Sequence, residues 1–206
     1  MGRQKQHGEV VRNALLAAAE KIVEMHGISA LSVRSVADAV ETTTRAVYSV
    51  FGSKDGLLEA LATRLFEILN EAIDGCETSG DPVADVLTIS IDGFRRTALD
   101  HPALYGLVFL RVAPELRLGP LFNNVADSAF SRLQAHLARI SATDDRDDLF
   151  AMATAVHALT EGLASMELRG MIQADTDAVQ IWRDALHALI TGFGRPPLGR
   201  GFASGE

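Results

Sequence analysis

Residues 36–58 of this chain read VADAVETTTRAVYSVFGSKDGLL, and the spacing of apolar side chains in and just before this stretch predicts a pair of short helices. The first apolar set recurs at steps of three and four residues, at Val33, Val36, Ala37 and Val40. This spacing predicts a short helix with one apolar face, and Ser32 precedes it as an N-cap residue. We expect a turn at residues 41–43 and a second helix over about 44–51.

The helix expected over 44–51 has two opposite faces. At about 100° per residue, its apolar side chains fall together on one side, at Ala46, Val47, Val50 and Phe51. The other side carries Thr44, Arg45, Tyr48 and Ser49. A cation, hydroxyl groups and a phenol can bond to the phosphate oxygens and base edges of DNA. The pattern therefore indicates a helix-turn-helix pair whose second helix meets nucleic acid.

A long connecting helix is expected after the break at residues 52–56. Ser53 is its N-cap candidate, which places the Lys54 ammonium beside the free N–H groups of the first turn, a combination suited to a phosphate. The helix runs over about 56–74, with apolar side chains at Leu57, Leu58, Leu61, Leu65, Leu69 and Ile73.

Residues 9–66 resemble the DNA-binding domain of the tetracycline-repressor-like (TetR) family of regulators, most specifically in the run Tyr-x-x-Phe-x-x-Lys-x-x-Leu-Leu at 48–58. The resemblance implies that seven side chains contact DNA: Thr43, Thr44, Arg45 and Ser49 in the groove, Tyr48 and Lys54 on phosphates, and Arg34 as a flanking contact. Family members usually have Gly where this chain has Glu41. Glu41 makes the turn costly if its φ is positive, and it adds a negative charge near the DNA.

The rest of the chain also has helical periodicity, so we expect an all-α protein. Further helices are expected over about 9–25, 83–100, 102–112, 120–140, 147–169 and 176–193. The domain prediction is a helix-turn-helix DNA-binding domain at 1–55, a helical ligand-binding and dimerisation domain at 56–195, and a flexible tail at 196–206.

The charge distribution favours a protein that meets DNA through a small part of its surface. The 206 residues carry a net charge of −8, which argues against indiscriminate coating of nucleic acid. Residues 1–64 hold eight basic and seven acidic side chains, so the negative charge lies in the remainder. Because no run of about 18 apolar residues and no signal-like segment occurs, we expect no membrane span and a cytoplasmic location.

Two C-terminal helices are candidates for a dimer interface. A stripe of small residues follows the penultimate helix, at Ala151, Ala155, Ala158, Gly162 and Ser165, and would let another backbone approach closely. The last helix offers Trp182, Leu186, Leu189 and Phe193. We expect two helices from each subunit to form a four-helix interface in a homodimer, and the alternative is that both stripes line the core of one subunit.

Between these parts we expect a pocket for a small, largely apolar ligand. Its candidate residues are Phe94, His101, Tyr105, Phe109, Phe122, Phe130, Met152, His157 and Glu161. His157 and Glu161 lie one helical turn apart, where a hydrogen-bonded pair is favoured over a metal site because no third ligand is evident. Cys76, the single cysteine, lies in an expected loop as a bystander or as a redox or electrophile sensor.

These patterns predict a DNA-binding regulator and not an enzyme. No nucleophile-elbow, zinc-protease, dinucleotide-binding or phosphate-loop motif occurs, and we expect neither a cofactor nor a metal. The function expected is that of a repressor that binds a palindromic, double-stranded operator as a homodimer and is released by a small-molecule effector. Two alternatives stay open: an interaction protein of this fold without DNA binding, and a small all-α enzyme that uses the pocket.

Overall fold

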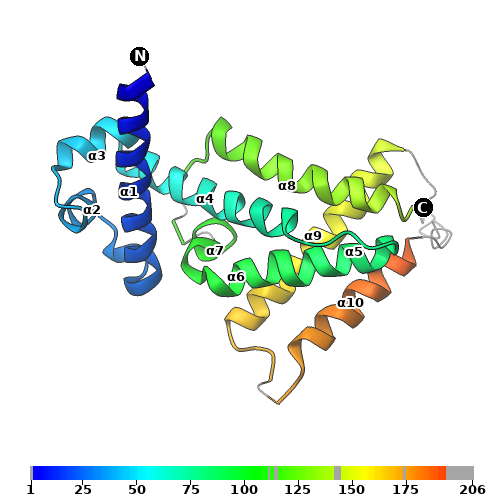
Figure 1. The fold of residues 1–206 in the computed structure, drawn as a ribbon. Coiled ribbons are helices and arrows are strands. Elements are labelled where there is room, and N and C mark those ends of the chain that lie inside the picture. The colour runs from blue at the N-terminus through cyan, green and yellow to red at the C-terminus, as the bar shows by residue number, and fades with distance from the viewer. Residues whose placement is uncertain (1, 111, 114–115, 142–144, 174, 194–206) are drawn as a thin grey trace, which may run out of the picture.

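The structure, a computed structural model, describes residues 2–110, 112–113, 116–141, 145–173 and 175–193. The tail predicted at 196–206 lies outside these residues. No strand occurs among the described residues, which confirms the all-α prediction. A small helical head (residues 2–53) lies at one end of a longer helical body (residues 54–193), and a single helix runs from one into the other (Figure 1).

The head consists of α1 (Gly2–His26), the short 3₁₀ segment η1 (Ile28–Ala30), α2 (Val33–Ala39) and α3 (Thr44–Phe51). At the start of α2, Ser32 Oγ accepts a hydrogen bond from Ser35 N at 2.9 Å, and Ser35 Oγ accepts one from Ser32 N at 2.9 Å. Thr43 caps α3 through its own hydroxyl. These caps satisfy N–H groups that have no partner within their helices, so short helices of seven and eight residues have defined ends.

A tight junction joins the head to the connecting helix α4 (Lys54–Asp74). Gly52 ends α3 with a φ of 75°, in the left-handed region, and Ser53 Oγ caps α4. A Cβ atom at Gly56 would overlap the carbonyl oxygen of Phe51, so only glycine permits this approach of α4 to the end of α3. The orientation of α3 is therefore closely tied to that of α4.

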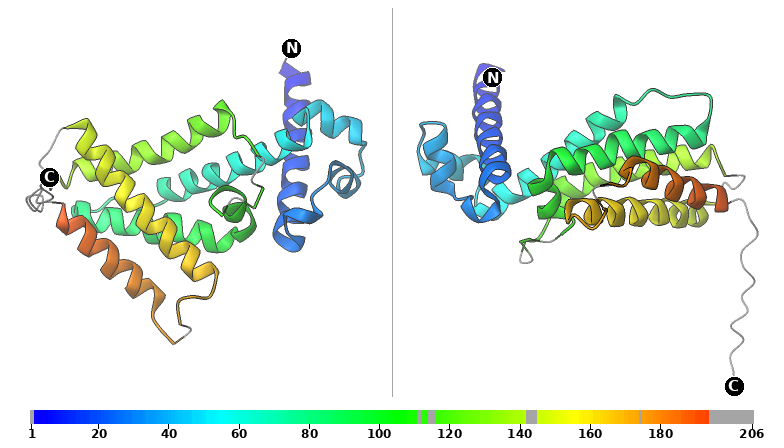
Figure 2. Two further views of the ribbon diagram at one scale, coloured as in Figure 1. Left: turned by 180° about the vertical axis from the view of Figure 1, so that it is seen from behind. Right: turned by 90° about the horizontal axis from the view of Figure 1, so that it is seen from below.

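Over the residues that the structure describes, the body adds six helices and one π-helical segment to α4. They are α5 (Pro82–Thr88), η2 (Ile89–Arg95), α6 (Arg96–Asp100), α7 (Pro102–Val108), α8 (Pro120–Ala138), α9 (Arg146–Leu168) and α10 (Ala178–Gly192). Figure 2 shows the long helices α4, α8 and α9 packed side by side, with α4 entering the body from the head.

One difference from the sequence prediction lies in the helix expected over 83–100. The chain is helical there, but its middle part, η2, has π-helical hydrogen bonding between α5 and α6. Gly93 of η2 lies against α4, where a Cβ atom would meet Ile73 Cγ1 at 3.3 Å. A uniform period of 3.6 residues cannot predict such a change of winding.

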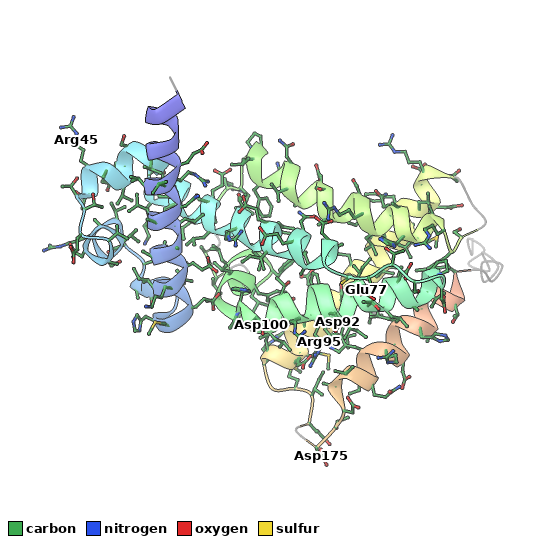
Figure 3. The ribbon with its side chains drawn as sticks, viewed as in Figure 1. Arg45, Glu77, Asp92, Arg95, Asp100 and Asp175 are labelled. Atoms are coloured by element: carbon green, nitrogen blue, oxygen red, sulfur yellow. The ribbon has the colours of Figure 1, made fainter. Side chains whose placement is uncertain are left out.

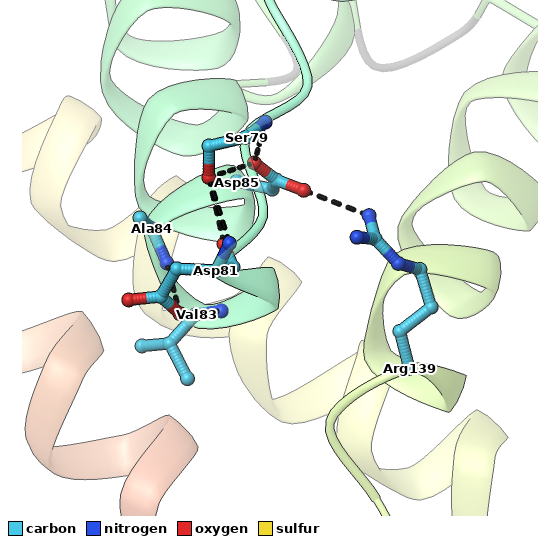
Figure 4. Close-up of polar contacts among 6 residues, drawn as sticks. All are labelled: Ser79, Asp81, Val83, Ala84, Asp85 and Arg139. Atoms are coloured by element: carbon cyan, nitrogen blue, oxygen red, sulfur yellow. Dashed lines mark hydrogen bonds and ion pairs between the residues drawn. The ribbon is translucent and has the colours of Figure 1, made fainter.

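A buried carboxylate ties the loop before α5 to α8. Asp85 Oδ1 accepts hydrogen bonds from Ser79 N at 2.6 Å and Ser79 Oγ at 2.7 Å, and Asp85 Oδ2 accepts one from an Arg139 guanidinium nitrogen at 2.7 Å (Figure 4). The hydrogen bonds from Ser79 lower the pKa of Asp85 to about 2. The neighbouring Asp81 caps α5 by accepting from Val83 N at 2.9 Å.

The inner face of α10 packs within its own subunit. Trp182 and Leu186 are completely buried, and α10 contacts both α9 and α5. The indole nitrogen of Trp182 donates to Glu167 Oε2 at 3.1 Å, and Glu167 also pairs with Arg95. The prediction that Trp182 and Leu186 contact a second subunit is therefore wrong, because their apolar face is used by the core of the monomer. Leu189 and Phe193 are partly buried.

Among the described helices, α9 has the length and composition of a membrane span, although no long uninterrupted apolar run occurs in the sequence. The most apolar part of α9 is 39% buried inside the body. Core helices of soluble proteins have the same length and composition, so this feature is weak evidence for a membrane span.

Candidate DNA-binding surface and ligand cavity

The polar face of α3 is open to solvent. Thr44, Arg45 and Ser49 are exposed and Tyr48 is 51% exposed, whereas Val47 on the opposite face is buried in the head. Figure 3 shows Arg45 at the outer edge of the head, pointing away from the rest of the molecule. The structure thus places four of the seven predicted DNA contacts on one accessible helix face.

The other three predicted contacts flank that face. Lys54 is exposed at the first position of α4, next to N–H groups at a helix start. Arg34 of α2 is exposed and lies 3.9 Å from Asp38, a long ion pair that a phosphate can replace. Thr43 is exposed, but its Oγ1 accepts from Ala46 N at 3.3 Å, so it acts first as the cap of α3.

Glu41 in the turn between α2 and α3 has a φ of 54°. It is the only non-glycine residue with positive φ among those described. Its side chain is exposed, so no packing contact offsets the cost of this conformation. The φ of Glu41 is therefore positive, which is the case in which a residue other than glycine makes this turn costly.

The body contains a largely apolar cavity of about 390 Å³. Four elements line it: α4, η2, α8 and α9. Its aromatic lining consists of Phe66, Phe94, Phe130 and Phe150, and the remaining lining residues are Leu69, Ile73, Ile89, Ser90, Ala126, Asp127, Ala129, Leu133, Thr154, Val156, His157 and Thr160. The volume and the mostly apolar walls are typical of small-molecule sites.

The predicted pocket residues have different places in the body. Phe94, Phe130 and His157 line the cavity. Tyr105, Phe109 and Phe122 form an aromatic cluster beside it: the Tyr105 and Phe109 rings lie 4.8 Å apart, and Phe122 contacts Phe66 at 5.3 Å. Met152 is buried and is not a lining residue, and Glu161 lies beside His157 with 3.8 Å between Oε2 and Nε2.

His101 does not lie in the cavity, contrary to the prediction. Its Nδ1 is 3.5 Å from Glu20 Oε1 of α1, at the contact between head and body. Close by, the Glu24 carboxylate of α1 accepts hydrogen bonds from Ala103 N at 3.1 Å and Leu104 N at 3.2 Å. His101 occupies the N-cap position of α7 but its side chain makes no capping hydrogen bond. Glu24 of α1 therefore caps α7 from another helix.

Burial shifts the pKa of one group that lines the cavity and of one group beside it. The pKa of His157 is lowered, chiefly by burial, and the carboxylate of Glu161 opposes this only in part. The imidazole is therefore neutral at pH 7 and can donate one hydrogen bond and accept another. Burial also raises the pKa of Tyr105, whose hydroxyl donates to the Glu161 carbonyl oxygen at 3.0 Å.

The sequence did not point to Phe66, Asp127 or Phe150 as cavity residues, nor to Glu24 as a cap. Phe150 is 57% exposed with its ring 5.5 Å from that of Phe130, and an exposed phenylalanine gives no signal in a helical pattern. The partners of Glu24 are backbone atoms about 80 residues away, and local spacing cannot reveal such a contact.

The small-residue stripe on α9 is mostly open. Ala151, Ala158 and Gly162 are exposed and Ala155 is half-buried. A Cβ atom at Gly162 would meet nothing within 4 Å. Ser165 departs from the prediction because it is buried against the Tyr105 hydroxyl.

Cys76 lies beside a small polar cavity lined also by Arg132 and His136. Burial raises the pKa of the Cys76 thiol, which disfavours the reactive thiolate. No group of three metal-ligating side chains occurs in the part of the chain that the structure describes.

Comparisons with known proteins agree with this architecture. Residues 15–61 match the model of bacterial regulatory proteins of the tetR family, and residues 90–189 match that of the tetracyclin repressor-like C-terminal domain. No curated protein matches the chain.

Several solved structures share the fold. A protein of unknown function from Rhodococcus sp. RHA1 has a TM-score of 0.72 and 22% identity, covering 90% of this chain and 96% of that one. The TetR regulator SCO7222 from Streptomyces coelicolor has a TM-score of 0.69 and 17% identity, covering 90% and 99%. BioQ with its natural double-stranded DNA operator has a TM-score of 0.64 and 22% identity, covering 90% and 98%.

The two family models together span the helix-turn-helix head and most of the body, and the fold agrees over about nine-tenths of the chain. The chain therefore belongs to the tetR family of bacterial regulatory proteins and is a DNA-binding transcriptional regulator.

Proposed function

We propose that this protein is a repressor that binds a palindromic operator as a homodimer and is released when a small, largely apolar ligand occupies the cavity. The observation that carries the proposal is the exposed Arg45 and Tyr48 face of α3, joined by one continuous helix, α4, to a body with an apolar cavity.

On the DNA, Arg45 is the principal base contact. A guanidinium can donate two parallel hydrogen bonds to a guanine edge in the major groove. Tyr48, Lys54 and Arg34 bond to phosphates, which position α3 without reading sequence. Thr43, Thr44 and Ser49 complete the groove contacts. The exposed side chains of Arg34 and Lys54 suit this role, because among the described residues Arg34 has only the long ion pair with Asp38 and Lys54 has no ion pair.

A second copy of the chain covers the α9 stripe in this proposal. Exposed small residues at Ala151, Ala158 and Gly162 let a partner helix approach closely, and the exposed Met166 one turn further on extends the contact. A two-fold dimer then presents two α3 helices to half-sites about 34 Å apart along the duplex, or a multiple of that spacing. Leu189 of α10 and Phe193, which follows α10, border this contact.

The ligand acts on the head through α7 and α4. Phe94 of the cavity wall contacts Tyr105 and Phe109, and α7 is held to α1 by Glu24. On the other side, Phe66 belongs both to the cavity and to α4. A ligand that binds better when these helices are shifted away from operator spacing weakens DNA binding by its differential affinity for the two states.

The test is retention of sheared DNA from the source organism on the purified protein at two salt concentrations, followed by sequencing. We expect a palindromic site, weaker binding at higher salt, and a loss of about tenfold to a hundredfold in affinity for Arg45→Ala. Arg96→Ala is the matched control, because Arg96 is an exposed arginine on the body, away from α3.

Equal retention by wild type and Arg45→Ala would contradict the role of α3. Sedimentation at several concentrations tests the dimer: Gly162→Arg is expected to yield monomers, and a dimer that persists in this variant would show that the α9 stripe is not the interface.

A further inference from the structure

The lining of the cavity indicates which class of ligand it holds, an inference that rests on the proposed function of the cavity as the effector site. Its walls combine four phenylalanine rings with two ionisable side chains, Asp127 and His157. No lysine or arginine is among the lining residues. The cavity therefore offers a negative side chain to a charged ligand but no Lys or Arg.

Asp127 is the charged group available to a ligand. It lies on α8, it is exposed while lining the cavity, and it makes no hydrogen bond or ion pair with the described residues. Its carboxylate thus lies where the cavity meets solvent and keeps all its acceptor positions free.

Aromatic rings line the same cavity as Asp127. Phe150 is 57% exposed although it lines the cavity, and its ring lies 5.5 Å from that of Phe130 in an edge-to-face arrangement. The faces of such rings attract cations, most strongly where water is partly excluded. Asp127 lies one helical turn from Phe130 on α8, and both line the cavity together with the exposed Phe150. A carboxylate in a cavity with these rings favours a positively charged group attached to an apolar body.

The deeper part of the cavity gives an anion no partner. His157 is neutral because burial disfavours its charged form, and Glu161 lies beside it at 3.8 Å. A ligand carboxylate or phosphate would lose its hydration without gaining a cation, which is costly in an apolar site. Neutral apolar molecules would bind without this penalty but would gain nothing from Asp127.

We propose that the cavity binds a lipophilic amine, whose aromatic or aliphatic body lies among Phe66, Phe94 and Phe130 and whose ammonium pairs with Asp127 at the mouth. His157 is left to hydrogen-bond a polar atom within the ligand body.

The test compares three probes that share one apolar body: 3,3-diphenylpropylamine, 3,3-diphenylpropanol and 3,3-diphenylpropionate. Isothermal titration calorimetry on the full chain is expected to rank affinity as amine, then alcohol, then carboxylate. Asp127→Asn is expected to weaken the amine about threefold to tenfold and to leave the alcohol unchanged. Asp127→Glu keeps the charge and is expected to retain the preference.

Asp100→Asn is the control for the loss of one negative charge, because Asp100 is exposed on α6 and does not line the cavity. A carboxylate that binds as tightly as the amine, an amine preference that survives Asp127→Asn, or no binding of any probe would each overturn the proposal. DNA retention by wild type and Arg45→Ala is measured separately, so failure of the ligand class is distinguishable from failure of the regulator function.

Discussion

Replacing Glu41 by glycine is expected to stabilise the protein and to tighten its binding to DNA. Glu41 has a φ of 54°, in the left-handed region that costs an ordinary L-residue about 1–2 kcal/mol. Glycine removes this cost but loses more backbone entropy on folding, by about 0.5–1 kcal/mol. The side chain of Glu41 is exposed, so its removal forfeits no packing.

The difference leaves a net stabilisation of about 0.5–1 kcal/mol for Glu41→Gly. With an m-value of about 2 kcal/mol/M for urea, the urea concentration at the unfolding midpoint should rise by roughly 0.25–0.5 M. The measurement is equilibrium urea unfolding followed by circular dichroism, at one fixed protomer concentration because a dimer would make the midpoint concentration-dependent.

Glu41→Gln separates the backbone effect from the charge effect. Glutamine keeps the costly φ but removes the negative charge beside α3, so its urea midpoint should equal that of wild type. Both variants should bind DNA about twofold more tightly at low salt, and the gain should shrink as salt screens the charge. A stabilised Glu41→Gln, or a Glu41→Gly no more stable than wild type, would refute the backbone argument.

Three further outcomes follow from contacts described above. Gly56→Ala should destabilise the folded protein by about 2 kcal/mol, because the added Cβ overlaps the Phe51 carbonyl oxygen. Gly8→Ala, on an open helix surface, should not destabilise it, and thermal unfolding compares the two variants. Glu24→Ala should cost about 1 kcal/mol through the lost cap of α7 and should reduce the effect of a cavity ligand on operator affinity, measured by fluorescence anisotropy. The pKa of Asp85 is about 2 in the folded protein against an ordinary value of 3.8, so the Asp85 carboxylate stabilises the folded state fully above pH 4 and loses this effect as pH falls towards 2. The urea midpoints of Asp85→Asn and wild type should therefore converge across that range.

The sequence determined the features that arise from local periodicity and capping. The two faces of α3 follow from the spacing of eight residues, so local periodicity alone places Arg45 and Tyr48 on the exposed side. The N-cap positions Ser32 and Ser53 were readable for the same reason, since a capping hydroxyl bonds to an N–H group only three residues away.

The partners of the apolar and acidic faces follow only from how the helices pack. The apolar face of α10 looks the same in sequence whether it packs on its own subunit or on a second one, and Trp182 turned out to be completely buried in its own. Likewise, nothing near Glu24 or His101 in the sequence indicates a contact between α1 and α7, because the interacting groups are about 80 residues apart. Local patterns define which side chains lie on each face of a helix, and only the packing of the whole chain determines which other helix contacts that face.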